Sequence, residues 1–186
     1  GIRLILDESF VDFSQDWETS SLLDNGILQA YPNLIVVKSI SKSFGVPGLR
    51  LGILASANKE LIAQIKKEVS IWNLNSFAEF FMQIYTKYEK DYKRACEKFQ
   101  MERTRFYHAL SAVPFLRVIP SEANYFLCEV TDRFSSTELT ERLLKDYNIL
   151  IKDCDTKNGL QDKNYIRIAV RNTADNNRLV EVLMSL

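Results

Sequence analysis

Two short runs of apolar, β-prone residues, 2–6 and 34–37, constrain the fold of this chain more than any other feature of its sequence. The first run stops at Asp7 and Glu8, and a stretch with a loosely helical pattern, residues 18–30, separates the two runs. Uninterrupted apolar runs are typical of strands that are buried on both faces of a parallel sheet. A strand, a helix and a second strand in this order predict a β-α-β unit and therefore an α/β fold.

The rest of the pattern predicts a second, smaller domain. A third strand is expected through 51–55, then a helix over 58–69, then a long helical region that opens with a capping-box pattern at Ser76 and Glu79. Beyond Pro114 the expected elements are strands near 115–119 and 125–130, a helix opened by Ser135, strands at 149–152 and 165–170, and a helix after Thr173. We predict a mostly parallel-sheet domain over residues 1–85 and a small α+β domain over residues 86–186.

The charge balance, the apolar runs and the cysteines of the chain indicate which partners and compartments to expect. The chain has 24 basic and 24 acidic side chains, and this balance gives no electrostatic footprint for nucleic acid. No apolar run approaches the roughly eighteen residues of a transmembrane helix. Cys96, Cys128 and Cys154 form no C-x-x-C pair, which fits a reducing compartment, and the N-terminal residues have no signal-peptide layout. We expect a cytoplasmic protein with no nucleic-acid partner, no membrane partner and no metal site.

The loop from Ser39 to Arg50 is the strongest candidate for a binding site. Lys42 follows a predicted buried strand, and two glycines in the loop let its backbone approach a ligand closely. Taken alone, such a loop is more often an exposed turn. Together with Asp7, however, it supplies what pyridoxal phosphate requires: an amine for a Schiff base, a carboxylate for the pyridine nitrogen, and hydroxyl and guanidinium donors for the phosphate.

The pair Asp7-Glu8 has two other interpretations. Acidic residues at the end of a strand are often only solvated, and an apolar strand ending in Asp-Glu also occurs in nucleotide triphosphatases, where the acid holds magnesium. The phosphate-binding pattern G-x-x-x-x-G-K-[ST] that such enzymes need does not occur in these residues. The triphosphatase hypothesis therefore ranks below the pyridoxal phosphate hypothesis.

Three motifs, at residues 7–10, 39–52 and 165–171, occur in the order and spacing of a known family. Together they resemble the class I/II aminotransferases of pyridoxal-phosphate fold type I, most of all the branches of histidinol-phosphate aminotransferase and threonine-phosphate decarboxylase. The resemblance runs from the first strand to the C-terminus. It implies that residues 1–85 form part of the cofactor-binding large domain and residues 86–186 the small domain, with pyridoxal 5′-phosphate as cofactor.

The resemblance implies a role for each cofactor-binding residue. Lys42 would form the Schiff base and carry the proton, Asp7 would face the ring nitrogen, and Ser39 and Arg50 would bind the phosphate. Phe10 would lie at the cofactor, where many aminotransferases have a tyrosine whose hydroxyl binds the ring oxygen. Phenylalanine at this position is more similar to the threonine-phosphate decarboxylase branch.

The resemblance also implies a substrate site. Arg167 would bind the substrate carboxylate, for which a bidentate arginine is geometrically suited, and Asn124 would lie near it. Arg171 is equally well explained as an exposed charge or as a substrate contact. The run 148–154 resembles the decarboxylase branch, and 72–75 resembles both that branch and aminotransferase domains that follow nucleotidyltransferases handling small phosphorylated or phosphonate amines.

We therefore expect a transaminase that acts on a small amino acid or amine, with or without a phosphate group, and on a keto acceptor. The alternatives are a decarboxylase of the threonine-phosphate type and a dimerisation or regulatory module without chemistry. Family members are considerably longer than this chain, so we expect an upstream half, and weak or no activity of these 186 residues alone. The resemblance also implies a homodimer.

Overall fold

The computed structural model describes residues 2–186, and the chain divides into two compact units, a first unit that ends at Glu97 and a second unit, Lys98–Leu186. The predicted boundary after residue 85 falls before this division. Residues just beyond 85 still pack on the first unit, because the ring of Tyr92 stacks on that of Phe44 with the centroids 4.1 Å apart. The assignment of the two units to a large and a small domain stays a prediction.

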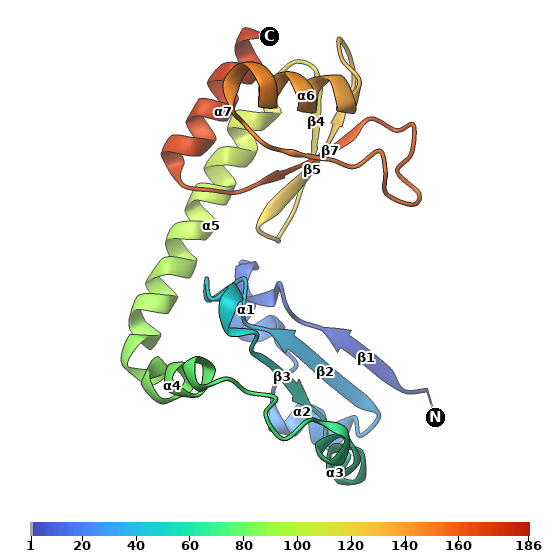
Figure 1. The fold of residues 1–186 in the computed structure, drawn as a ribbon, viewed down its shortest axis with the longest axis vertical. Helices are drawn as coiled ribbons and strands as arrows, with labels where there is room; N and C mark the ends of the chain where they lie inside the picture. The colour runs from blue at the N-terminus through green and yellow to red at the C-terminus, as the bar shows by residue number, and fades with distance from the viewer. Residues whose placement is uncertain (1) are drawn as a thin grey trace. The chain divides into compact units, whose positions relative to one another are not determined.

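The first unit contains a three-stranded sheet in the order β1-β2-β3 (Figure 1). Strand β1 pairs parallel with β2, as the predicted mostly parallel sheet requires, whereas β3 pairs antiparallel with β2 and departs from it. The elements are β1 (Leu4–Asp7), η1 (Val11–Phe13), α1 (Trp17–Ser20), α2 (Asn25–Ala30), β2 (Leu34–Ser39), η2 (Pro47–Leu49), β3 (Gly52–Ala55), α3 (Lys59–Glu68), α4 (Ser76–Ile84), η3 (Tyr85–Tyr88) and the start of α5 (Glu89–Ser111).

The sheet is less buried than the sequence predicts. Strand β2 carries the core of this unit, with Leu34 and Val36 packed against Leu28 of α2. Strand β1 is at the edge, and its Leu4 and Ile5 side chains are 57% and 64% exposed. The expectation of a buried first strand is therefore wrong for the described residues, because only β2 flanks β1 among them.

The helical stretch predicted over residues 18–30 is two short helices with a break between them. Ser21 and Leu22 lie in the break, and both donate hydrogen bonds to the buried carboxylate of Glu8, from the Ser21 Oγ at 2.7 Å and from the Leu22 amide at 2.6 Å. Asp24 then caps α2 by accepting from the amides of its first turn. The break ties the α1–α2 connection to the end of β1.

The predicted capping box at Ser76 and Glu79 is also corrected. The N-cap of α4 is Asn75, whose Oδ1 accepts from the Ala78 amide at 3.0 Å while its Nδ2 donates to the Leu49 carbonyl at 2.8 Å. An asparagine amide can do both at once, and the backbone of Asn75 is extended as a cap requires. The long helical region is divided by η3 into α4 and α5.

The second unit is a four-stranded antiparallel sheet, in the order β4-β5-β7-β6, with helices packed on it, as an α+β domain is expected to be. Its elements are the remainder of α5, β4 (Leu116–Ile119), β5 (Tyr125–Val130), α6 (Ser136–Tyr147), β6 (Lys152–Asp153), β7 (Tyr165–Ala169) and α7 (Thr173–Ser185). The predicted start of α6 at Ser135 is confirmed, and Ser135 forms a capping box with Glu138. Strand β6 is shorter than predicted, because α6 ends in a left-handed Asn148 that redirects the chain.

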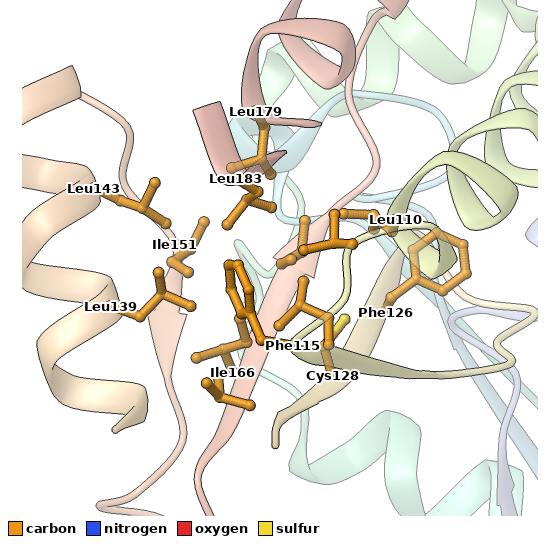
Figure 2. Close-up of a cluster of buried hydrophobic side chains, with 14 of the residues drawn as sticks. Leu110, Phe115, Phe126, Cys128, Leu139, Leu143, Ile151, Ile166, Leu179 and Leu183 are labelled. Atoms are coloured by element: carbon orange, nitrogen blue, oxygen red, sulfur yellow. The ribbon is translucent and has the colours of Figure 1, made fainter. Parts of the chain in front are cut away.

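One contiguous core holds the second unit together (Figure 2). Phe126 from β5 and Ile166 from β7 point into it, and Leu139 from α6 and Leu183 from α7 close it, all of them essentially without solvent exposure. The opposite face of the sheet is left for polar side chains by the alternation of residues along each strand.

A polar network joins α5 to α7 through Glu102. Its carboxylate accepts from Arg105 Nε and Nη2 at 3.0 and 2.7 Å, from Thr173 Oγ1 at 2.8 Å and from Asn176 Nδ2 at 2.7 Å. The hydrogen bonds from Arg105 first, and then those from Asn176 and Thr173, lower the pKa of Glu102 from 4.5 to about 2 against the opposing effect of burial.

This network predicts an acid-dependent stability. Because the pKa of Glu102 is lower in the folded state, its stabilising effect is complete above about pH 4.5 and is lost as the pH falls towards 2. We expect Glu102→Gln to remove about 2 kcal/mol of unfolding free energy at pH 7 and to flatten the pH dependence in that interval. Urea unfolding measured between pH 2 and 7 tests this, with the exposed Glu181→Gln as control. An unchanged slope in Glu102→Gln contradicts it.

Candidate active site

The first unit places polar side chains at the carboxyl ends of β1 and β2. Asp7 ends β1, and its Oδ1 accepts from the amide of Ser9 at 2.9 Å and from the hydroxyl of Ser9 at 2.5 Å. The Ser9 hydroxyl oxygen in turn accepts from the amide of Ser39, the last residue of β2, at 2.9 Å. Ser9, which the sequence reading did not single out, thus links the two strand ends.

The Asp7 carboxylate is held in its charged form. Hydrogen bonds from Ser9 are the largest cause that lowers its pKa, and the positive charge of Lys42 lowers the pKa further, against burial. The Lys42 amine also contacts the ring of Phe10, three residues after Asp7. The two residues on which the pyridoxal phosphate hypothesis depends therefore lie in the same part of the first unit.

Lys42 lies in the exposed loop that follows β2. Its Nζ lies 3.9 Å from the centroid of the Phe10 ring, within the range of a cation–π contact. A phenylalanine here offers the lysine an apolar face and no hydroxyl. Phe10 lies three residues after the end of β1, so its contact with Lys42 brings the motifs 7–10 and 39–52 together.

The predicted phosphate ligands flank Lys42 in the loop. The Ser39 and Ser41 hydroxyl groups lie 2.7 Å apart, so they can present both oxygens to one anion. Arg50 is exposed, has a left-handed backbone with φ of 52°, and donates from Nη1 to the Pro47 carbonyl at 3.1 Å. Ser41 is an addition to the predicted set, and its signal in the sequence is the alternation Ser-Ile-Ser before the lysine.

The predicted substrate residues belong to the second unit. Arg167, on the exposed face of β7, has its guanidinium carbon 5.1 Å from the centroid of the Tyr125 ring. The Asn124 carbonyl accepts from the Val170 amide at 2.9 Å, which fixes this turn next to β7. Lys152 on β6 pairs in register with Arg167, so the two cations share one face of the sheet. The sequence reading missed Lys152, although its place in the run 148–154 was a signal.

The contacts of Glu8 make a magnesium site at Asp7-Glu8 the less favoured alternative. The Glu8 carboxylate is buried and already accepts from Ser21 and Leu22, and Asp7 accepts from Ser9. Among residues 2–186, no three acidic, histidine or cysteine side chains gather in a way that could hold a metal ion.

In the same range, no helix is both long and apolar enough to cross a lipid bilayer.

Comparison with known proteins identifies the class. The chain matches the family "Aminotransferase class I and II" over residues 1–183, and it belongs to this family. This confirms the resemblance drawn from the three motifs. The fold is accordingly part of pyridoxal-phosphate fold type I, with the α/β character that the sequence predicts.

Two particular relatives are about one third identical to the chain over the residues that align. It is 32% identical over 186 residues to the CMP-5′-(3-aminopropyl)phosphonate synthase of Streptomyces rubellomurinus, covering all of this chain and 29% of that protein. It is 35% identical over 190 residues to the threonine-phosphate decarboxylase of Salmonella typhimurium, covering all of this chain and 49% of that protein. The chain thus spans half or less of the length of these two relatives.

A solved structure also matches this chain over about half of its own length. The histidinol-phosphate aminotransferase from Clostridium acetobutylicum superimposes with a TM-score of 0.87 and 31% identity, over 98% of this chain and 53% of that one. The cofactor of this family is pyridoxal 5′-phosphate, and the chemistry of the residues present fits it. Lys42 offers an exposed primary amine, Asp7 a carboxylate held in its charged form, and Ser39 and Ser41 paired hydroxyl groups.

Proposed function

We propose that this chain is the lysine-bearing part of a pyridoxal phosphate-dependent aminotransferase that acts on a small amino acid or amine, with or without a phosphate group. The observation that carries the proposal is the proximity of the Lys42 amine and the Asp7 carboxylate at the ends of β1 and β2. In parallel α/β folds, ligands bind at the carboxyl ends of the strands. The match to the aminotransferase family supports it.

Each residue has a separate task in this proposal. When bound, pyridoxal phosphate supplies an electron sink for the negative charge that develops at the substrate α-carbon. Lys42 would hold the cofactor through its Nζ and would move a proton at the substrate α-carbon. Asp7, whose pKa is lowered, would favour a proton on the ring nitrogen. Ser39, Ser41 and Arg50 bind the phosphate.

Decarboxylation is the second candidate, and two observations favour it. Phe10 has no hydroxyl for the ring oxygen, and the relative from Salmonella typhimurium is a threonine-phosphate decarboxylase. Lys42 and Asp7 serve both reactions. The reactions differ in which bond of the α-carbon lies perpendicular to the cofactor ring.

The full-length protein, loaded with pyridoxal phosphate, separates the candidates. Transfer of the amino group to 2-oxoglutarate or pyruvate, without release of carbon dioxide, is expected for the aminotransferase. Carbon dioxide release from threonine phosphate or serine phosphate, with no dependence on a keto acid, would replace the proposal by decarboxylation. Absence of a Schiff-base absorbance band would favour a module without chemistry.

We also propose that the full-length protein is a cytoplasmic homodimer whose partners are a small-molecule amino donor and a keto acceptor. Fold type I enzymes bind their cofactor near a subunit interface, as the family resemblance implies. Sedimentation of the full-length protein at micromolar concentration is expected to give the mass of a dimer. A monomer at that concentration would contradict this part of the proposal.

Arg167 is expected to control substrate affinity. Replacing it with lysine keeps the charge and removes the two parallel N–H groups that bind a carboxylate. We expect KM for a carboxylate substrate to rise about 10- to 100-fold, as loss of a charged hydrogen bond does, with a smaller change in kcat. The exposed Arg142→Lys on α6 is the control. An equal loss of kcat with unchanged KM would show that Arg167 acts elsewhere.

A further inference from the structure

A buried ion pair lies at the end of the lysine-bearing strand, outside the site described above. Lys38, on β2, donates from Nζ to Asp12 Oδ1 at 2.5 Å, and the side chains are 11% and 3% exposed. Successive strand residues point to opposite faces, so Lys38 and Asp12 lie on the face opposite to Ser39.

Three polar atoms next to this pair have no hydrogen-bond partner among the described residues. They are Asp12 Oδ2, Ser43 Oγ and the Tyr92 hydroxyl, and all three are buried. They lie near one another, because Phe44, the residue after Ser43, stacks on the Tyr92 ring with the centroids 4.1 Å apart. Burial and then the Asp12 charge raise the pKa of Tyr92, and the Ser43 hydroxyl and the Cys96 thiol are close enough to the Tyr92 hydroxyl to act on it as hydrogen-bonding groups. Leaving such groups without partners is costly, and native proteins satisfy them with protein atoms or with buried water.

The three atoms belong to elements that hold the lysine loop. Ser43 directly follows Lys42, and the next residue, Phe44, stacks on the ring of Tyr92 with an interplanar angle of 4°. Tyr92 is on α5 and Asp12 is in η1. A molecule bound to all three would tie the backbone beside Lys42 to both elements.

We propose that Asp12 Oδ2, Ser43 Oγ and the Tyr92 hydroxyl form a binding site for one water molecule, and that this site positions the Lys42 loop. The charges of Asp12 and Lys38 cancel, so the site favours a neutral ligand over a cation. Water can donate to the carboxylate oxygen, donate to or accept from the two hydroxyl groups, and so satisfy all three atoms. The relevance of the site to catalysis, though not its existence, depends on the proposed role of Lys42.

A double-mutant cycle in the full-length, cofactor-free protein tests the proposal. Tyr92→Phe keeps the stacked ring and removes the hydroxyl, and Ser43→Ala removes the second partner. We expect each change to speed amide hydrogen exchange in residues 41–45 about five- to tenfold, and the double variant to add little, because both changes release the same molecule. Tyr88→Phe, at an exposed tyrosine of η3, is the control and is expected to leave exchange unchanged.

Three results would overturn the proposal: exchange rates that multiply in the double variant, exchange rates that do not move in either single variant, and a high-resolution crystal structure in which Ser43 and Tyr92 contact each other with no water at Asp12. A water within hydrogen-bond distance of all three atoms supports it. These measurements use no substrate and no cofactor. Their outcome is therefore independent of the Schiff-base absorbance that tests the proposed function.

Discussion

Replacement of Lys42 by alanine is expected to abolish turnover of the full-length protein, with a loss in kcat of at least about 10⁴-fold, because in the proposed function Lys42 both forms the Schiff base and moves the proton. The absorbance band of the Schiff base should disappear with it. Borohydride treatment of the unmodified protein, followed by peptide mass spectrometry, should place the reduced cofactor on Lys42. These readouts together assign the residue independently of the substrate.

The matched control is Lys59→Ala, which removes an exposed lysine at the start of α3 and should change neither activity nor absorbance. Retention of the absorbance band in Lys42→Ala would assign the Schiff base to another amine. Nucleotide hydrolysis that depends on magnesium and ignores Lys42 would revive the triphosphatase hypothesis.

Replacement of Asp7 by asparagine is expected to lower kcat by about 10²- to 10³-fold, which is the usual effect of removing one group that stabilises charge in the transition state. Asparagine can still accept the hydrogen bonds from Ser9, so the link between the strand ends survives. Lys42 is intact, and the absorbance band should persist, although it will respond differently to pH. The measurement is kcat and a pH titration of the band.

The pH dependence of the unmodified protein gives a second check on Asp7. Because hydrogen bonds from Ser9 hold the pKa of Asp7 below its ordinary value, protonation of Asp7 is expected only below that value, and a loss of activity at a higher pH must come from another group. Asp16→Asn, at an exposed aspartate beside α1, is the control. Full activity in Asp7→Asn would remove the carboxylate from the mechanism.

The sequence predicts the order of the elements well where local rules decide. The helix opened by Ser135 and the strands β5 and β7 both appear as expected, because a cap and a period-two pattern depend on neighbouring residues. The sequence fails where distant residues compete. Asn75 replaces Ser76 as the cap because it also reaches the Leu49 carbonyl, 26 residues away.

The residues of the candidate site also divide into those that local sequence predicts and those that depend on distant contacts. Lys42, Asp7 and Ser39 could be found from the sequence, because each follows an apolar strand and chemistry restricts which residue types can serve there. Ser9 and Tyr92 could not be found in this way. Ser9 contacts Ser39, 30 residues away, and Tyr92 contacts Phe44, 48 residues away. No local sequence pattern predicts contacts over such separations.

The open edge of the first sheet has a practical consequence. β1 lies at that edge, and the backbone N–H and C=O groups on its outer side, flanked by exposed Leu4 and Ile5, can add a strand from any neighbouring molecule. Overproduction of this segment in isolation should therefore yield insoluble material. The substitution Ile5→Lys is expected to reduce this aggregation, since a charged side chain on an edge strand disfavours pairing with a strand of another molecule.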